Sequence, residues 1–257
     1  MNWLQRTEVL IGEEGLQRLR QANVLIVGMG GVGSFAAEYI GRAGVGRMTI
    51  VDGDTVEGTN RNRQLPALCS TDGQYKTDIM AARLHDINPD LQLTVVSEYM
   101  VEERIQALFE HGLFDYVIDA IDTLTPKMSL IKNCKQRGIP VVSSMGAGGK
   151  LDPSKLKIAD LSKTYNCSLA QQLRKQLRKW GIKKGVKVVF STELPDKSKV
   201  QLVEGSRHKK SYFGTISYMP SLFGCFCASV VIRHIIEPPK AQHSRRQEEG
   251  ETPKDVE

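Results

Sequence analysis

The sequence has 257 residues, enough for one large domain or two small ones, and its 40% hydrophobic content is ordinary for a globular protein with a sizeable core. Its five cysteines form no Cys-x-x-Cys pair, so we expect neither a disulfide framework nor a structural zinc site. Free cysteines and an N-terminus without a signal-peptide pattern favour a cytoplasmic protein.

The formal net charge of +6 is unevenly distributed along the chain. Residues 155–211 contain 15 lysines and arginines against 4 acidic residues, so the remainder of the chain is net negative. A segment this basic is typical of a protein that binds an anionic macromolecule. A solvated helix face is the alternative that this pattern alone leaves open.

Residues 2–20 predict an N-terminal helix that is divided by Gly12 and Gly15. Five residues form its predicted apolar side: Leu4, Val9, Leu10, Leu16 and Leu19. We therefore expect this helix to cover part of a core that begins with the next segment.

Residues 24–33, VLIVGMGGVG, join a buried strand to the start of a helix through a glycine-rich turn. Gly28, Gly30 and Gly33 follow the G-x-G-x-x-G spacing, which permits a tight turn, the approach of a phosphate and close helix packing. Gly31 lies in the same turn, and the free N–H groups of the helix start favour an anion. The motif predicts a nucleotide site, although alone it also fits a merely tight strand-to-helix turn.

A second buried strand at 47–51 ends on Asp52 and completes a β-α-β unit. An acid at this position can accept hydrogen bonds from ribose hydroxyls, and the alternative is a cap on the following turn. We expect Asp54 to be the residue that forms this turn.

The polar and basic residues 56–68 predict a loop over the carboxyl end of the sheet, where ligands bind in open α/β folds. Arg61 and Arg63 are expected to reach into the site from this loop. Lys76 begins a helix predicted over 76–88, where its charge opposes the helix dipole. This mismatch makes Lys76 a candidate phosphate ligand.

Strands and helices then alternate regularly along the chain. The expected strands and helices are strand 91–96, helix 102–110, strand 116–121, helix 124–137 and strand 139–144. This alternation predicts an α/β fold, a Rossmann-like, doubly wound and mostly parallel sheet.

The alternation stops after residue 149, where an α+β extension on the same sheet is predicted. Its expected parts are a strand at 155–161, a helix at 168–179, a strand at 186–192, a polar loop at 195–210 and a buried helix at 222–236. We read the last apolar run as a core helix and not as a membrane span. The predicted domains are an N-terminal core at 1–149, a basic substrate-binding extension at 150–236 and a disordered tail at 237–257.

Four motifs between residues 2 and 149 resemble those of the ubiquitin-activating-enzyme-like (ThiF/MoeB/HesA) adenylating family. In chain order they are GMGGVG, VDGDTVEGTNRNRQ, GQYKTD and VIDAIDT. The resemblance implies that Asp52 holds a ribose and that Asn60, Arg63 and Lys76 contact the phosphates of ATP. The implied nucleotide-binding set is Gly28, Gly30, Gly31, Gly33, Asp52, Asp54, Asn60, Arg63, Lys76 and Asp122.

The same resemblance assigns catalytic roles and a homodimer. Asp122 is implied to hold a magnesium ion that bridges the ATP phosphates, and Arg6 to reach into the partner subunit's site. Attack of a carboxylate on a phosphate brings anions together and needs such positive charge. The implied catalytic set is Arg6, Arg63, Lys76 and Asp122.

The basic half resembles the branch of this family that activates the threonyl carboxylate of a modified tRNA adenosine and then cyclises it. The resemblance rests on KTYNCSLAQQLRKQLRKWGIKKG and GTISYMPSLFGCFCASVVIRHII. It implies tRNA as partner and residues 174–184 as a basic helix. The implied tRNA contacts are Arg174, Lys175, Arg178, Lys179, Lys183, Lys184, Arg207, Lys209 and Lys210.

The alternative function is an activator of the C-terminus of a ubiquitin-like or sulfur-carrier protein. The absence of zinc-binding cysteine pairs and the basic half favour the tRNA branch. A nicotinamide oxidoreductase, suggested by the glycine motif alone, explains neither Arg63 nor Lys76. We expect Cys167 to be an ordinary thiol, because a tethered nucleophile needs no thioester carrier. A monovalent cation and a cysteine-desulfurase or other sulfur-relay partner stay open.

Overall fold

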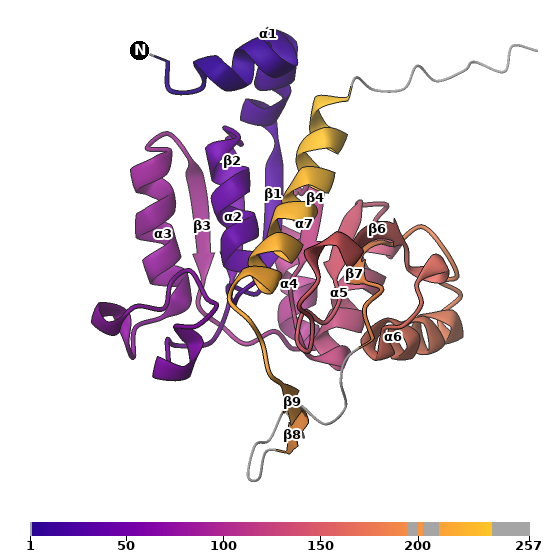
Figure 1. The fold of residues 1–257 in the computed structure, drawn as a ribbon. Coiled ribbons are helices and arrows are strands. Elements are labelled where there is room, and N and C mark those ends of the chain that lie inside the picture. The colour runs from indigo at the N-terminus through magenta and orange to yellow at the C-terminus, as the bar shows by residue number, and fades with distance from the viewer. Residues whose placement is uncertain (1, 195–199, 203–210, 238–257) are drawn as a thin grey trace, which may run out of the picture.

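The computed structural model describes residues 2–194, 200–202 and 211–237 and contains a seven-stranded sheet in the order β3-β2-β1-β4-β5-β7-β6 (Figure 1). Its strands are β1 (Asn23–Val27), β2 (Arg47–Val51), β3 (Gln92–Val96), β4 (Tyr116–Asp119), β5 (Val141–Ser144), β6 (Leu156–Asp160) and β7 (Lys187–Ser191). All neighbouring strands are parallel except β6 and β7. The predicted doubly wound sheet is confirmed, as is the expectation that the C-terminal half extends it.

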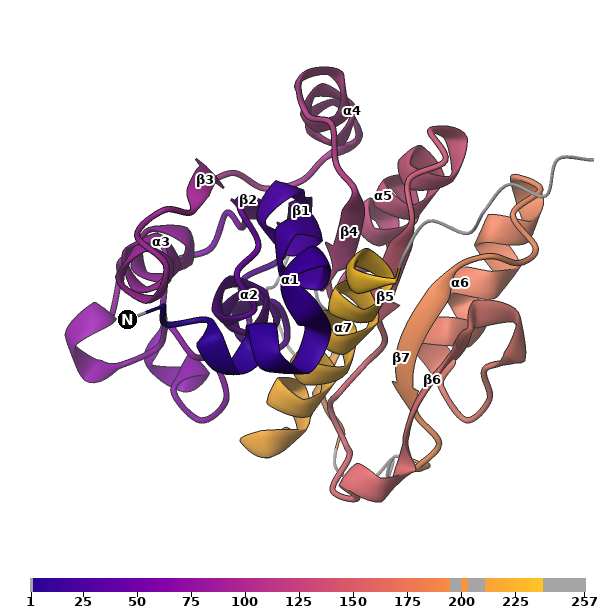
Figure 2. The same ribbon diagram turned by 90° about the horizontal axis from the view of Figure 1, so that it is seen from above.

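Helices cover both faces of the sheet. They are α1 (Gln5–Gln21), α2 (Gly33–Arg42), α3 (Lys76–Ile87), α4 (Glu102–His111), α5 (Leu124–Gln136), α6 (Ser168–Lys179) and α7 (Tyr218–Ile236). Seen along the sheet in Figure 2, α4, α5 and α6 lie on one face, and α1, α2 and α7 lie on the other. A short second sheet pairs β8 (Val200–Leu202), inside the polar loop predicted at 195–210, with β9 (Ser211–Phe213), directly after it. Most of that loop, and all of the tail predicted at 237–257 except residue 237, fall outside the described residues.

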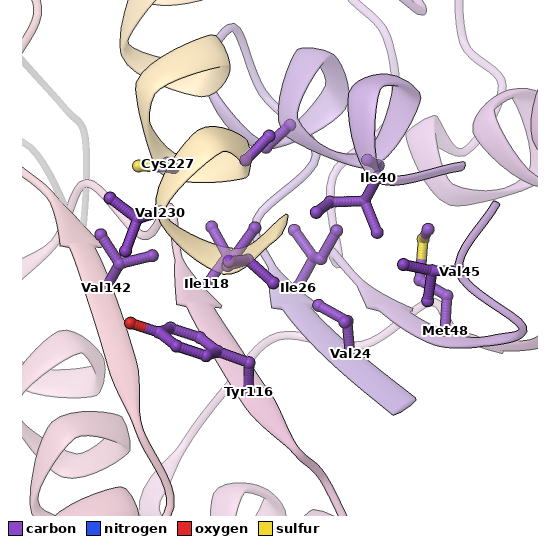
Figure 3. Packing of buried hydrophobic residues seen from close by; sticks show 14 of the residues in the cluster. Val24, Ile26, Ile40, Val45, Met48, Tyr116, Ile118, Val142, Cys227 and Val230 are labelled. Atoms are coloured by element: carbon purple, nitrogen blue, oxygen red, sulfur yellow. The ribbon is translucent and has the colours of Figure 1, made fainter. Parts of the chain in front are cut away.

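Two hydrophobic clusters fill the space between sheet and helices, and the strands contribute to both. In β1, Val24 and Ile26 belong to one cluster, whereas Leu25 and Val27 belong to the other. This explains the continuous apolar run that predicted a buried strand, since both faces of a parallel sheet are covered. Figure 3 shows the first cluster, with Ile26 and its neighbours packed beneath α7.

Helix α7 is a core helix of this fold. Within the described residues it is long and apolar enough to cross a membrane by length and composition, yet Met219, Phe223 and Val231 on it are fully buried against α2 and the sheet. It begins four residues earlier than predicted because Pro220 falls within its first turn, where a missing N–H costs nothing. The interpretation of this run as a buried helix fits the structure.

Helix α1 differs from the prediction in two ways. It has one break, at Gly12 (φ 75°), whereas Gly15 continues the helix. Leu16 and Leu19 are buried as expected, but Val9 and Leu10, predicted to face the core, are each 84% exposed. Leu4, which precedes Gly12, is also buried as expected, so the exposed apolar residues are confined to the segment directly before the break.

Helices α2 and α7 approach closely because Gly224 has no side chain. A Cβ atom at Gly224 would overlap the carbonyl oxygen of Val32 and lie 3.0 Å from the backbone nitrogen of Ala36. We expect Gly224→Ala to lower the free energy of unfolding by about 1–3 kcal/mol, the usual cost of overpacking. Urea unfolding measures the change, and Gly214→Ala is the control, because a Cβ there meets no atom within 4 Å. Equal stability of the two variants would contradict this account of the packing.

Candidate active site

The candidate site lies at the carboxyl edge of the sheet, the edge at which the parallel strands end. Strand β1 is the switch point, because the chain passes to β2 and β3 on one side of it and to β4 and β5 on the other. The turns after β1, β2 and β4 meet there: Gly28 N donates to the Val51 carbonyl at 2.7 Å, and Ala120 N donates to the Val27 carbonyl at 2.9 Å.

The glycines of the turn after β1 are required for different reasons. Gly28 has a φ of 98°, and a Cβ there would lie 2.8 Å from the Ala120 carbonyl oxygen. A Cβ at Gly33 would overlap the Gly28 carbonyl oxygen, and one at Gly31 would lie 2.9 Å from Pro220 of α7. At Gly30 the nearest atom would be 3.8 Å away, so its backbone is the part of the turn that a ligand can approach.

Asp52 ties this turn to the end of β2. Its two carboxylate oxygens accept hydrogen bonds from Met29 N at 2.6 Å and Asp54 N at 2.8 Å. Burial raises the pKa of Asp52, while the nearby Lys76 ammonium and the two N–H donors oppose the rise. The carboxylate is thus fixed by backbone donors beside the glycine turn, with further lone pairs available to hydroxyl groups.

Lys76 is the first residue of α3 and is only 4% exposed. Its Nζ lies 2.7 Å from Oδ2 of Asp54, whose side chain is half exposed. Asp54 therefore does more than form the turn that the sequence predicted, since it also holds the lysine at the carboxyl edge. The arrangement places a buried ammonium next to Asp52, where an anion can compete for it.

The loop after β2 contains the predicted asparagine and arginines. Asn60 is buried at the end of a 3₁₀ turn, and its Oδ1 accepts from Glu57 N at 3.2 Å. The Arg63 guanidinium donates to the Thr59 carbonyl at 3.0 Å. Arg61, also expected to reach inward, is exposed and bonds instead to its own loop, at the Gly58 carbonyl.

Gln64 is a site residue that the sequence analysis missed. Its Oε1 is buried and has no hydrogen-bond partner, and its amide is the group closest to Gly30. A buried amide oxygen without a partner is costly, so this atom is poised for a donor that arrives with a ligand. The signal available in the sequence was its place directly after Arg63 in the N-x-x-R-Q motif.

Asp122 follows β4, which ends at Asp119 and not at residue 121 as predicted. Asp122 is exposed at the carboxyl edge, in the turn that packs on the glycine turn through Ala120. Asp119 is instead fully buried and paired with Lys127 of α5. The sequence analysis identified neither partner of this pair.

Arg6 is exposed in the first turn of α1, and this helix lies at the amino edge of the sheet, opposite to the glycine turn (Figure 1). The preceding Leu4 packs on Gly44, just before β2 begins. The predicted catalytic residues Arg63, Lys76 and Asp122 therefore lie together at the carboxyl edge of the sheet, whereas Arg6 does not.

The basic residues of the C-terminal half follow a different pattern from the one predicted. Helix α6 ends at Lys179, so Lys183 and Lys184 lie in the turn after it and not on a helix running to 184. Lys175, Arg178, Lys179, Lys183 and Lys184 are exposed. Arg207, Lys209 and Lys210 lie outside the described residues.

Trp180 and Cys167 flank α6. Trp180 is 45% exposed, and the Lys132 ammonium lies 5.0 Å from the centre of its ring. Cys167 is half-buried at the N-cap position. The segment that contains α6 starts and ends at the amino edge, because Leu161 N, at the turn after β6, donates to the Val186 carbonyl just before β7.

The chain belongs to the ThiF family, whose model matches residues 4–251. It is 51% identical over 195 residues to the tRNA threonylcarbamoyladenosine dehydratase of Bacillus subtilis, covering 76% of each chain, and 42% identical over 201 residues to that of Escherichia coli, covering 74% of this chain and 75% of the other. The crystal structure of E. coli tRNA N6-threonylcarbamoyladenosine dehydratase in complex with ATP superimposes with a TM-score of 0.82 at 37% identity, covering 91% of this chain and 95% of that one.

Arg174 has a structural role that separates it from the other predicted tRNA contacts. It is half-buried, and its guanidinium donates to the Thr164 carbonyl at 2.9 Å and to the Thr164 hydroxyl. We expect Arg174→Ala to lower the free energy of unfolding by about 1–3 kcal/mol, because acceptors buried beside it lose their donor. Arg178→Ala, one turn further along the same helix and exposed, is the matched control in thermal or urea unfolding. Equal losses would show that Arg174 is as dispensable to the fold as its neighbour.

Proposed function

We propose that this protein uses ATP to dehydrate N6-threonylcarbamoyladenosine in tRNA: it adenylates the threonyl carboxylate, and the modified side chain then cyclises. The observation that carries the proposal is the match, over most of the chain, to tRNA threonylcarbamoyladenosine dehydratases at 37–51% identity. The geometry supports it, because a glycine turn, a fixed carboxylate and a buried lysine share one edge of the sheet.

The nucleotide pocket is proposed around the open backbone of Gly30. The helix start of α2 offers N–H groups to a phosphate, and Gln64 offers the buried Oε1 that still needs a donor. Asp52 accepts the ribose hydroxyls, since its backbone hydrogen bonds already fix its orientation. Lys76, released from Asp54 by a stronger anion, neutralises phosphate charge. Asn60 and Arg63 complete the phosphate contacts.

We propose Asp122 as the protein ligand of a magnesium ion bound with ATP. In the part of the chain that the structure describes, no three His, Cys, Asp or Glu side chains gather into a metal site. An exposed carboxylate at the rim of a phosphate site suits magnesium, which binds through one or two carboxylates together with phosphate oxygens. The ion would neutralise the departing pyrophosphate.

The reaction divides into two displacements. The threonyl carboxylate attacks the α-phosphorus of ATP, the bond to the bridging oxygen breaks, and pyrophosphate leaves. The carbamoyl group of the same side chain then attacks the acyl carbon, AMP leaves, and one proton is lost. Because the nucleophile is tethered, its effective concentration is large, and no cysteine thioester is required. Cys167 is accordingly not proposed as a catalytic residue.

In a homodimer, Arg6 would reach an active site, which it does not do within its own chain. Arg6 lies at the amino edge of its own sheet, so we propose that it enters the site of the partner subunit. The same half of α1 exposes Val9 and Leu10 almost completely, which is unusual for adjacent aliphatic residues on a helix. Their contact with a second copy would bury this surface.

We propose a division of labour along the chain: residues 1–149 activate the carboxylate, and residues 150–236 select the RNA. The second part carries the exposed cations of α6 and the turn after it, and Trp180 beside them offers a ring for base stacking. Activation of a ubiquitin-like or sulfur-carrier protein, the alternative, leaves this basic surface without a role. We propose a cytoplasmic enzyme, since both tRNA and ATP are available in the cytoplasm.

Incubation of tRNA with the protein and ATP should convert threonylcarbamoyladenosine into a product lighter by one water molecule. Mass spectrometry of the digested nucleosides measures the conversion. Lys76→Ala should lower the rate about 10²- to 10³-fold, since a preorganised cation is removed from the phosphates. Arg47→Ala is the control, because Arg47 is an exposed cation at the opposite end of β2. Unchanged nucleosides would refute the function, and a fully active Lys76→Ala enzyme would refute the site.

Binding of tRNA should weaken steeply with salt, because phosphate contacts release counterions. The double variant Lys179→Ala/Lys183→Ala should bind more weakly and show a shallower dependence of log K on log salt, by about 0.7–0.9 for each phosphate that is no longer neutralised. Filter binding at several salt concentrations measures both, and Arg20→Ala/Arg47→Ala is the control, because it removes the same amount of charge from exposed cations at the end of α1 and the start of β2. A flat salt response, or equal effects of the two double variants, would contradict the proposed RNA surface.

A further inference from the structure

A fully buried ion pair lies directly below the turn that carries Asp122. The ammonium of Lys127, near the start of α5, is 2.8 Å from Oδ2 of Asp119 at the end of β4, and both side chains are 0% exposed. The ammonium also donates to Ser143 Oγ at 3.0 Å and to the Ser144 carbonyl at 2.9 Å, both at the end of β5. All three donor positions of the ammonium are thereby occupied.

Both oxygens of the Asp119 carboxylate also accept hydrogen bonds, and their donors come from different elements of the fold. Oδ2 accepts from Ser143 Oγ at 2.6 Å in addition to Lys127, and Oδ1 accepts from the backbone N–H of Ile121 at 3.1 Å. The cluster therefore connects β4, β5, α5 and the β4–α5 turn. Ile121, whose N–H is anchored in this way, directly precedes Asp122 in the chain.

Stability alone is a poor reason for such a pair. Removing two charges from water is expensive, and hydrophobic residues of similar volume often replace a buried ion pair without loss of stability. What the pair does fix is geometry, because each hydrogen bond has a preferred length and direction. The turn that it fixes also packs on the glycine turn, where Ala120 lies against Gly28 and Gly33.

We propose that Lys127, Asp119 and Ser143 are positioning residues that hold the β4–α5 turn so that the carboxylate of Asp122 meets the metal and phosphates of bound ATP. The inference rests on the proposed role of Asp122. Partners that orient a metal ligand without touching the metal commonly change its affinity, because they fix the direction of the ligand's lone pairs. Here the partners fix the backbone of the ligand's turn.

Calorimetric titration of ATP, in EDTA and in excess magnesium, tests the proposal without turnover. The parent protein should bind ATP more tightly with magnesium, and Asp122→Asn should abolish this gain. Lys127→Met should reduce the gain about 10- to 100-fold, the range typical when a group that orients a metal ligand is removed, and leave binding in EDTA unchanged. Lys127→Arg, which keeps the charge, should recover part of the gain.

Ser143→Ala and Ser129→Ala provide a matched pair of milder variants. Both serines are buried, but Ser143 belongs to the cluster, whereas the hydroxyl of Ser129, on α5, has no hydrogen-bond partner. Ser143→Ala should show a smaller magnesium gain than the parent, and Ser129→Ala should keep all of it. This pair carries the test if Lys127→Met does not fold.

The outcomes distinguish the positioning role of the buried cluster from the proposed metal-binding role of Asp122. A full magnesium gain in Ser143→Ala and Lys127→Met, with the gain abolished in Asp122→Asn, overturns the positioning role and leaves the function intact. A full gain in Asp122→Asn overturns the proposed metal ligand, and the positioning role falls with it. A parallel loss of binding in EDTA, by the same factor, also overturns the proposal, because it indicates general damage to the nucleotide pocket.

Discussion

The close contact between the glycine turn and the β4–α5 turn is the constraint on which the site depends. Gly28 lies so near to the Ala120 carbonyl that it has no space for a side chain, and Gly33, blocked by the Gly28 carbonyl, also lies against Ala120. This contact joins the strands on either side of the switch point and leaves Gly30 as the open part of the turn. Asp52 and Asp119 then hold each turn from below through backbone N–H groups. The candidate site is thus a set of backbone turns held by one half-buried and one fully buried carboxylate, to which the candidate phosphate-binding side chains are added.

Much of the fold could be predicted because local signals and tertiary packing agree. Helix α6 begins and ends at the predicted residues, since its three buried residues follow a clear helical period. The exposure of Val9 and Leu10 could not be predicted from that kind of pattern. An apolar side seen in a sequence indicates burial against something, and it does not distinguish the chain's own core from another molecule. The two exposed residues lie directly before the kink at Gly12, which redirects the helix.

Sequence patterns also predicted only some of the residues of the candidate site. Asp52 and Lys76 could be proposed from the sequence because an acid at the end of the second strand suits ribose hydroxyls and a lysine at a helix start opposes the helix dipole. Lys127 gave no such signal: a lysine in a helix is expected on the surface, and only the fold shows that it is completely buried. Arg174 presents the opposite case, since a basic run predicted an RNA contact where the guanidinium bonds to the chain itself. The charge of a side chain indicates which kinds of group it can bind, but the sequence does not show which of them it contacts in the folded protein.

The position of α7 has a consequence for how the protein is made. Pro220 packs on Gly31 of the glycine turn, Phe223 fills the core above β1, and the carbonyl of Ile236 accepts from Arg18 of α1. The residues proposed to bind the nucleotide are synthesised first, but the surface on which they rest is completed only by α7, the last helix that the structure describes. During translation the early half of the chain must therefore wait, with apolar surface uncovered, until α7 leaves the ribosome. The proposed boundary at residue 149 separates two proposed tasks, but α7, which belongs to the second part, completes the core of the first.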